Sequence, residues 1–200
     1  MSYIISIEGG EGSGKGLVTK KLKEMFPDFV FTREPGGTKI AEQIRNVIVD
    51  KENVGMTPIT EAMLFAAARN QHLVDKVIPA LEQGKVVVFD RYYDSSLVYQ
   101  GIARGLGMET VWEINKVAVG NCIPKLTIYL DIDPAKGLAR IAENNRETNR
   151  LDLESMDFHN KIRAGYLQIA EMFPERIRVV NADQTPDEVF ADVVNLINNI

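Results

Sequence analysis

Short runs of apolar residues alternate along the chain with longer segments in which apolar positions recur every three or four residues. The short runs predict β-strands, and their lack of polar alternation predicts strands that are covered on both faces. The longer segments predict amphipathic helices. The expected strands are residues 4–7, 29–32, 85–89, 126–131 and 177–180, and the expected helices are residues 15–25, 38–49, 57–83, 95–103, 109–119, 134–143, 158–172 and 186–200.

Capping residues define several of these helix boundaries. Thr57 is followed by a proline, which is typical of an N-cap and the first helical position. Gly84 ends the long pattern that begins there, and Pro79 inside it predicts a kink or a break near its end. Asp183 or Thr185 lies at the expected cap of the last helix.

The alternation of strands with helices predicts an α/β fold. We expect one domain over residues 1–200, with a three-layer arrangement in which a five-stranded parallel sheet carries helices on both faces. Ligands of such sheets bind beyond the carboxyl ends of the strands. The connections expected to gather there are residues 9–16, 33–37, 90–96 and 144–152.

Composition narrows the class of protein. With 200 residues, 45% of them hydrophobic, the chain can bury one sizeable core. The net charge of −5 argues against a nucleic-acid polymer as partner, because such partners need a basic face. A single cysteine excludes an internal disulfide and fits a reducing cytoplasm. Neither a signal-peptide pattern nor an apolar run of about 18 residues is present, so we expect no secretion and no membrane span.

The strongest local motif is IISIEGGEGSGK, residues 4–15, in which an apolar strand runs into a glycine-rich turn and then a lysine. Its spacing fits G-x-x-x-x-G-K, a loop whose amides surround phosphates while the lysine reaches the β- and γ-phosphates. The alternative is a glycine-rich turn that binds nothing; the order strand, loop, helix favours phosphate binding. The expected phosphate-binding residues are Gly9, Gly10, Glu11, Gly12, Ser13, Gly14, Lys15 and Gly16.

Gly16 departs from this motif, which normally closes with a serine or threonine that ligates Mg²⁺. Thr19 lies about 4.5 Å further along the helix, whereas a Mg²⁺ ligand lies at about 2.0–2.1 Å. A water molecule is therefore the expected ligand in place of the hydroxyl.

Two charged residues, Asp90 and Arg91, end the third expected strand. An aspartate in this place commonly holds Mg²⁺ directly or through water. Arg91, Arg33 and Arg45 are suited to a phosphorylated acceptor, because a guanidinium matches phosphate oxygens. The alternatives are a capping carboxylate and solvated surface arginines, with Glu34 and Glu42 available as partners.

Two helices carry pairs of residues that could recognise a base. Phe65 and Arg69 are four residues apart, as are Ser96 and Gln100, so each pair shares a helix face. A ring followed by a guanidinium can stack on a base and bond its edge, and Gln100 offers both a donor and an acceptor. The alternative for Phe65 is a place in the core, and His72 is interpreted as a surface or helix-packing histidine.

Arginines also border the polar segment that follows the sixth expected helix: Arg140, Arg146 and Arg150. Such a segment can close on a transferring phosphoryl group, exclude water and stabilise its charge. An exposed charged loop is the alternative.

Six segments together resemble the bacterial thymidylate kinase family, P-loop enzymes that phosphorylate dTMP to dTDP with ATP. The matching segments are EGGEGSGK at 8–15, TREPGGT at 32–38, EAMLFAAARNQHL at 61–73, DRYYDSSLVYQGIARG at 90–105, LTIYLDID at 126–133 and NRLD at 149–152. They span nearly the whole chain, and they are far more specific than the phosphate loop alone.

The resemblance implies a P-loop NTPase fold, ATP as co-substrate, Mg²⁺ and a dTMP site. Phe65 would stack on thymine, Arg69 would contact its O4 edge and Gln100 its ring nitrogen. Ser96 would lie near the missing 2′-hydroxyl. The implied dTMP-binding residues are Glu34, Arg45, Phe65, Arg69, Arg91, Ser96 and Gln100.

It also implies a catalytic set and a quaternary state. Members of the family differ in whether the catalytic arginine lies in the phosphate loop or in a lid, and this chain resembles the lid type, with a lid at about residues 143–152. Asp90 would contact Mg²⁺, and homodimers are usual in the family. The implied catalytic residues are Lys15, Glu11, Arg91, Arg146 and Arg150.

Gly16 keeps two alternatives open. The chain could be a nucleotide-binding sensor that has lost catalysis, or a kinase for another pyrimidine monophosphate such as dUMP. Lys15, Asp90, Arg91 and the lid arginines oppose the first alternative, because a sensor needs no catalytic set.

Overall fold

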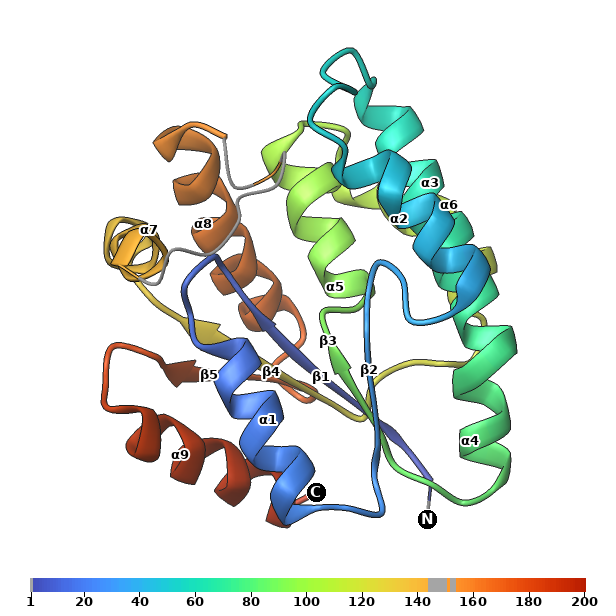
Figure 1. Ribbon diagram of the computed structural model, residues 1–200. Coiled ribbons are helices and arrows are strands. Elements are labelled where there is room, and N and C mark those ends of the chain that lie inside the picture. Colours follow the sequence, from blue (N-terminus) through green and yellow to red (C-terminus); the bar gives the residue numbers. More distant parts are fainter. Residues whose placement is uncertain (1, 144–150, 152–153) are drawn as a thin grey trace.

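The computed structural model describes residues 2–143, 151 and 154–200 and contains one parallel sheet (Figure 1). Every pair of neighbouring strands is parallel, and the strand order is β2-β3-β1-β4-β5. The predicted five-stranded parallel sheet is therefore confirmed, with boundaries shifted by a few residues. The strands are β1 (Ile4–Gly9), β2 (Val30–Arg33), β3 (Val87–Asp90), β4 (Leu126–Asp131) and β5 (Ile177–Asn181).

Helices cover both faces of this sheet, as the sequence predicts (Figure 1). Thr57 and Thr185 cap α3 and α9 as expected, and Ser155 caps α8. The helices of the described residues are α1 (Lys15–Met25), α2 (Lys39–Val49), α3 (Pro58–His72), α4 (Ile78–Glu82), α5 (Tyr93–Ser96), α6 (Met108–Val119), α7 (Pro134–Glu143), α8 (Met156–Met172) and α9 (Pro186–Asn198), with π-helical segments η1 (Leu73–Val77) and η2 (Leu97–Ala103).

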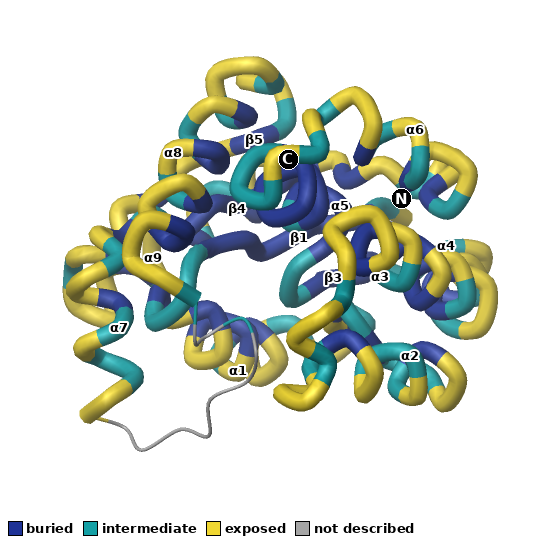
Figure 2. Tube along the Cα trace, turned by 90° about the horizontal axis from the view of Figure 1, so that it is seen from above, coloured by how far each residue is buried: buried dark blue, intermediate teal, exposed yellow. Residues whose placement is uncertain are grey.

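The alternation of side chains along β1 separates two cores. Ile5 and Ile7 join the side chains of α1 and α9 in one cluster, whereas Ile4 joins η1, α4 and α6 in another. A third cluster joins η2 and α8 beside β4. Figure 2 shows the buried strands between these layers. Two polar residues of β1, Ser6 and Glu8, share the face of Ile4 and lie fully buried.

The predicted break near Pro79 is confirmed, but it begins six residues earlier, at Leu73. The α-helix ends at His72, and a π-helical segment from Leu73 to Val77 precedes α4. Pro79 has no amide hydrogen to donate to the preceding turn, and the Ile78 amide just before it donates to the Leu73 carbonyl five residues back, as in a π-helix. The expected helix at 95–103 likewise divides into α5 and the π-helical η2.

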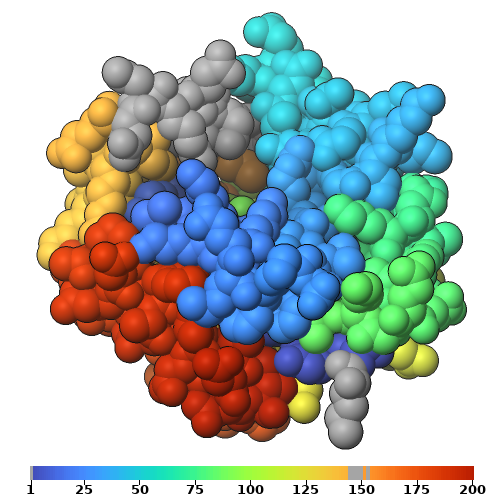
Figure 3. Space-filling view, turned by 60° about the horizontal axis from the view of Figure 1, so that its bottom comes forward, coloured from blue at the N-terminus to red at the C-terminus, as the bar shows by residue number. Residues whose placement is uncertain are grey.

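The first three strands end at the same edge of the sheet. The phosphate loop follows β1, the 33–37 turn follows β2, and Asp90 ends β3. In the space-filling view the blue segment that contains α1 lies between the red segment of α9 and the green segment that contains α4 (Figure 3). Among the described residues, no helix is long and apolar enough to cross a membrane.

Candidate active site

A cavity of about 750 Å³ opens at the carboxyl ends of these strands. The phosphate loop, the 33–37 turn, α3, the end of β3 and η2 all contribute to its walls. Gly9 and Gly10 do not line it. The predicted site residues that do are Glu11, Gly12, Ser13, Gly14, Lys15, Gly16, Glu34, Arg45, Phe65, Arg69, Asp90, Arg91, Ser96 and Gln100.

The phosphate loop folds around its own lysine. Lys15 Nζ donates to the Gly9 and Gly10 carbonyls, at 2.9 Å each, and contacts Ser13 Oγ at 3.3 Å. Burial, with a smaller contribution from Arg91, lowers the pKa of the Lys15 ammonium to about 8. The Lys15 ammonium is therefore partly desolvated, and a bound phosphate can replace the loop carbonyls as its partner.

Gly12 can be no other residue. Its φ is +69°, and a Cβ there would lie 1.9 Å from the Gly137 carbonyl oxygen. Gly16 is different, because it is exposed and a Cβ there would meet no atom of the described residues within 4 Å. Residues 2–143, 151 and 154–200 therefore give no steric reason for glycine at position 16. Thr19 is buried and does not line the cavity, in agreement with its exclusion as a metal ligand.

Asp90 supplies a carboxylate beside the loop. It ends β3, lines the cavity and lies close enough to Lys15 to act on that residue's pKa. No group of three or more acidic, histidine or cysteine side chains that could hold a metal occurs in the part of the chain that the structure describes. A single carboxylate fits Mg²⁺, which keeps several waters and binds one or two carboxylates together with substrate phosphates.

Arg91 reaches into the cavity from a strained backbone. Its φ of +66° lies in the left-handed region, which is uncommon for a residue other than glycine. Its guanidinium donates to Glu11 Oε1 at 2.7 Å and to the Tyr166 hydroxyl at 3.4 Å, and lies 5.2 Å from the centre of the Tyr99 ring. These contacts hold the Arg91 side chain in place where it lines the cavity.

Glu8, which the sequence analysis did not single out, stabilises the segment after Arg91. Its buried carboxylate accepts from the Tyr92 amide at 2.7 Å, from Ser95 Oγ at 2.6 Å and from the Tyr166 hydroxyl at 3.0 Å. Burial raises the pKa of this carboxyl. A carboxylate inside an apolar strand was the signal that could have identified it.

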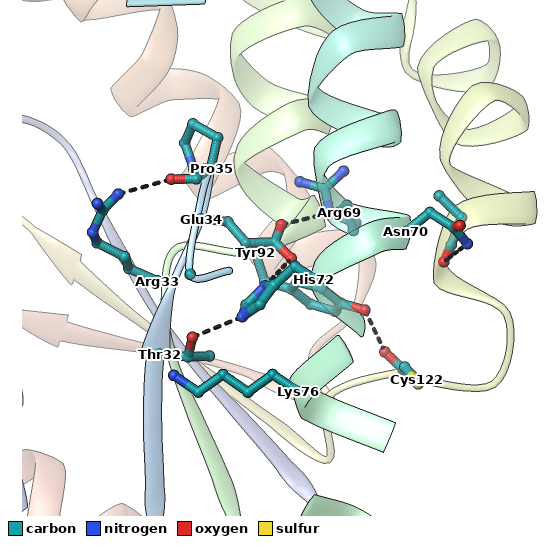
Figure 4. Close-up of polar contacts among 12 residues, drawn as sticks. Thr32, Arg33, Glu34, Pro35, Arg69, Asn70, His72, Lys76, Tyr92 and Cys122 are labelled. Atoms are coloured by element: carbon teal, nitrogen blue, oxygen red, sulfur yellow. Dashed lines mark hydrogen bonds and ion pairs between the residues drawn. The ribbon is translucent and has the colours of Figure 1, made fainter. Parts of the chain in front are cut away.

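A buried polar cluster joins the 33–37 turn to α3 (Figure 4). Glu34 accepts from Arg69 Nε at 2.7 Å and from His72 Nδ1 at 3.1 Å. Since an ionised carboxylate only accepts, Nδ1 carries the hydrogen, and Nε2 accepts from the Thr32 hydroxyl at 2.7 Å. The interpretation of His72 as a surface histidine is wrong, because its side chain is fully buried.

Arg69 is anchored on each of its three guanidinium nitrogens. Besides Glu34, it donates to Ser96 Oγ at 3.2 Å and to Asn115 Oδ1. The side chain is 2% exposed, yet it lines the cavity together with the half-buried Phe65. Phe65 thus borders the cavity, and the alternative of a core phenylalanine is not supported.

Gln100 lines the cavity from η2. Its Nε2 donates to Glu61 Oε1 at 2.8 Å. Arg104 approaches both oxygens of Glu61, at 3.4 and 3.5 Å, and donates to Glu154 Oε1 at 2.6 Å. Glu61 is four residues before Phe65 on α3, so the helical spacing was a signal that the sequence analysis missed.

The remaining arginines pair differently from expectation. Arg33 binds both oxygens of Glu42, at 2.8 and 3.0 Å, while Glu34 pairs with Arg69 instead of Arg33, Arg45 or Arg91. Arg45 is half-buried and donates to the Pro35 carbonyl at 3.1 Å. The solvated-surface alternative is therefore wrong for Arg45.

Of the arginines near the expected lid, Arg140 lies on α7, lines the cavity and donates to the Ala182 carbonyl at 3.1 Å. Arg146 and Arg150 lie outside the described residues, as does most of segment 143–152. Their predicted part in catalysis stays a prediction.

Comparisons with known proteins agree with this geometry. The family model described as thymidylate kinase matches residues 7–193. A thymidylate kinase of Clostridium novyi is 52% identical over 194 residues, covering 94% of this chain and 95% of that protein. One of Anoxybacillus flavithermus is 56% identical over 203 residues, covering 98% and 97%.

A solved structure agrees over nearly the full length. The crystal structure of thymidylate kinase from Ehrlichia chaffeensis superposes with a TM-score of 0.78, at 28% sequence identity, and the match covers 98% of each chain. The predicted P-loop NTPase fold is thereby confirmed. With the family model spanning the phosphate loop, the 33–37 turn, α3 and η2 alike, the chain belongs to the thymidylate kinase family of nucleoside monophosphate kinases.

Proposed function

We propose that this enzyme transfers the γ-phosphoryl group of ATP to the phosphate of dTMP and forms dTDP, a step in dTTP biosynthesis. The observation that carries the proposal is that Lys15 lines the same cavity as Phe65, Arg69 and Gln100. One end of the cavity offers an ammonium and main-chain amides, which suit the phosphates of a donor nucleotide. The other end offers a ring, a guanidinium and an amide, which suit a pyrimidine.

The acceptor base would occupy the end beside α3. Phe65 would stack on thymine, Arg69 would donate to O4, and Gln100 would bond the ring nitrogen. Glu34 supports this indirectly, because it fixes the Arg69 guanidinium through Nε. Ser96 accepts from the same guanidinium and would lie beside the deoxyribose, where little room for a 2′-hydroxyl is expected.

The acceptor phosphate would lie between Arg45 and Arg91. Both guanidinium groups line the cavity, and neither is used up in a bidentate carboxylate pair among the described residues. Glu11 accepts from Arg91 at 2.7 Å, so it holds the arginine toward the phosphate loop. This arrangement places the acceptor phosphate on the path to the donor.

The donor triphosphate would occupy the phosphate loop. Amides of residues 12–16 and the Lys15 ammonium would neutralise its phosphates. Asp90 is the residue that would hold Mg²⁺, directly or through water, and Gly16 leaves the other protein position to a water molecule. When bound, the ion neutralises charge on the phosphates of ATP.

The reaction needs positioning more than proton transfer. The dTMP phosphate oxygen that attacks is already ionised near neutral pH, so no general base is required. Lys15 and Arg91 would stabilise charge in the transition state, and Arg146 and Arg150 would follow the moving phosphoryl group from a lid at residues 143–152. The chain would act as one domain with that lid.

A coupled assay of ADP release with dTMP, ATP and Mg²⁺ tests the proposal. We expect ADP release that depends on dTMP and on Mg²⁺. Binding of both nucleotides without ADP above background would instead identify a nucleotide sensor. Comparison of kcat/KM for dTMP, dUMP, AMP and GMP tests the acceptor, and a preference for AMP or GMP would contradict the assignment.

We also propose that the enzyme is a homodimer. The outer face of α3, η1 and α4 carries four apolar side chains that are 37–56% exposed: Ile59, Met63, Val74 and Ile78. They recur at helical spacing, and Ile40 and Val47 on the neighbouring α2 are also exposed. A second copy that covers this stripe would remove it from water.

Light scattering on the eluted protein measures the dimer directly. Met63→Glu is expected to give monomers, because it places a charge in the covered stripe. Val179→Glu, on the exposed face of β5 at the other edge of the sheet, is the matched control and should leave the dimer intact. A wild-type monomer at micromolar concentration would contradict the proposal.

We further infer a cytoplasmic enzyme that acts on small nucleotides and not on nucleic-acid polymers. The single cysteine and the net charge of −5 support this.

A further inference from the structure

The side-chain amide of Gln100 is hydrogen-bonded to a buried carboxylate, that of Glu61, which does not line the cavity. Gln100 lines the cavity, whereas Glu61 does not and lies 1% exposed on α3. Gln100 Nε2 and Glu61 Oε1 are 2.8 Å apart. One residue therefore faces the acceptor site and the other fixes its orientation.

The carboxylate decides which end of the amide faces the cavity. Glu61 is paired with the Arg104 guanidinium at 3.4 Å, and the carboxylate of such a pair can only accept hydrogen bonds. Turning the Gln100 amide over would bring two oxygens within 2.8 Å of each other. The amide NH₂ is thus held toward Glu61, and Oε1, which accepts no hydrogen bond from any described residue, is left for the ligand.

The two polar groups that face a base then form an ordered pattern. Arg69 offers donors, and Gln100 Oε1 offers an acceptor. Thymine and uracil present the matching edge, with an acceptor at O4 beside a donor at N3–H. Cytosine presents the reverse, an amino donor at C4 beside an unprotonated N3, so its N3 lone pair would meet the Gln100 oxygen.

We propose that Glu61 is a positioning residue that sets the specificity of the acceptor site for pyrimidines with an N3–H group, by fixing the Gln100 amide. The inference rests on the proposed function, in which Gln100 meets the ring nitrogen of the acceptor base. Glu61 touches neither substrate, and its effect passes through Gln100.

Glu61→Gln tests this most directly. The new amide has nearly the same shape and can either accept from Gln100 or donate to it, so the Gln100 amide becomes free to turn over. Arg104 keeps its bond to Glu154 at 2.6 Å, so this guanidinium still has an anion beside it. The substitution therefore no longer fixes the orientation of the Gln100 amide, while the packing around residue 61 is kept.

The measurement is kcat/KM for dTMP, dUMP and dCMP with the full chain, ATP and Mg²⁺. The dTMP/dCMP ratio is expected to fall about tenfold in Glu61→Gln, and no further, because Arg69 still opposes the cytosine amino group. The dTMP/dUMP ratio should stay within about twofold, since both bases present the same edge. Proportional loss on all three substrates would show that Glu61 is merely structural and would overturn the inference.

Asp94→Asn is the matched control. Asp94 is also a buried carboxylate paired with an arginine, Arg176 at 2.7 Å, but it does not line the cavity. It should lower the melting temperature and leave the dTMP/dCMP ratio unchanged. If the dTMP/dCMP ratio of Asp94→Asn falls as far as that of Glu61→Gln, the effect comes from a general loss of stability, and the inference is contradicted.

Two further variants keep the test decisive. If Glu61→Gln does not fold, Glu61→Asp withdraws the carboxylate by one methylene and should also lower the ratio; a wild-type ratio overturns the inference. In a Gln100→Ala background, Glu61→Gln should change the ratio by less than about twofold. A wild-type enzyme inactive on dTMP would contradict the proposed function and this inference with it, whereas an active one with an unaltered variant ratio contradicts only the inference.

Discussion

The two ends of the cavity are prepared for their ligands to different degrees. At the acceptor end, Arg69 donates from three nitrogens to Glu34, Ser96 and Asn115, so its position is fixed before any substrate arrives. At the donor end, Lys15 is bonded to carbonyl oxygens of its own loop. The first set of contacts can persist on binding, whereas the second must be exchanged for phosphates.

Because of this difference, we expect different parts of the site to control the selection of the acceptor and the rate of phosphoryl transfer. A preorganised base site loses little entropy on binding and rejects bases whose edge does not match, because its buried groups would be left unpaired. The donor end can accept any triphosphate that draws Lys15 out of the loop. Selectivity among acceptors should therefore depend on α3 and η2, and the rate should depend on the phosphate loop.

Lys15→Met is expected to have the largest effect. It removes the cation nearest the donor phosphates, and kcat should fall about 10²- to 10³-fold while dTMP binding changes little. Lys20→Met, an exposed lysine on the same helix, is the control and should keep wild-type kcat. Titration of dTMP by calorimetry measures the binding; equal loss of dTMP affinity would show that the two ends are not separate.

Arg69→Ala should act on the other end. It removes a charged donor to the base, and kcat/KM for dTMP is expected to fall about 100-fold while ATP affinity stays nearly the same. Because Glu34 is left buried without its guanidinium, unfolding free energy should also fall, by about 3–5 kcal/mol.

Arg176→Ala is the control for that loss of stability. It breaks another buried pair, with Asp94, away from the cavity. It should destabilise the protein and keep kcat/KM for dTMP close to the wild-type value. If Arg69→Ala weakens ATP and dTMP equally, Arg69 is structural and not a base-recognition residue.

The pKa of Lys15 gives a third, smaller effect. With a pKa of about 8 in the free enzyme, the ammonium loses its proton as the pH rises through 8, and bound phosphates restore it. ATP binding should therefore be accompanied by proton uptake at pH values between about 8 and the higher pKa that Lys15 has in the ATP complex. The affinity for ATP should decline as the pH rises through that range. Calorimetry at pH 8.5 in two buffers of different ionisation enthalpy measures the uptake. Lys15→Arg, which does not titrate, should abolish it.

Gly16→Thr should change the least. A Cβ at this position comes within 4 Å of no atom in the part of the chain that the structure describes, and glycine in a helix costs about 0.5–1 kcal/mol relative to alanine. We expect kcat to be kept or raised by no more than about threefold and the melting temperature to rise slightly. A tenfold loss of kcat would mean that the loop has been rebuilt around glycine.

The sequence predicted the parts of this site that local patterns determine. The strand before the phosphate loop, the carboxylate that ends β3 and the shared face of Phe65 and Arg69 all follow from spacing along one element. The parallel sheet of five strands and the bounds of most helices were also close to those observed, whereas the order of the strands in the sheet was not predicted.

Pairings between distant side chains could not be predicted in this way. Glu34 and Arg69 form a hydrogen bond although they are 35 residues apart in the sequence, and Arg69 and Asn115 do so at a separation of 46 residues, because the fold brings their elements together. Glu34 was therefore assigned to the wrong arginines, and His72 to the surface. Local periodicity contains no information about which buried donor meets which acceptor.

The carboxylate of Glu8 restricts which substitutions can accumulate at the positions around it during evolution. It accepts from the Tyr92 amide, from Ser95 on α5 and from Tyr166 on α8. The two hydroxyls share the same carboxylate oxygen and also bond to each other at 2.8 Å, so the loss of one hydroxyl removes a donor from the buried carboxylate and a partner from the other hydroxyl. These positions are therefore expected to drift in concert, so that descendants either keep the whole trio or replace it together.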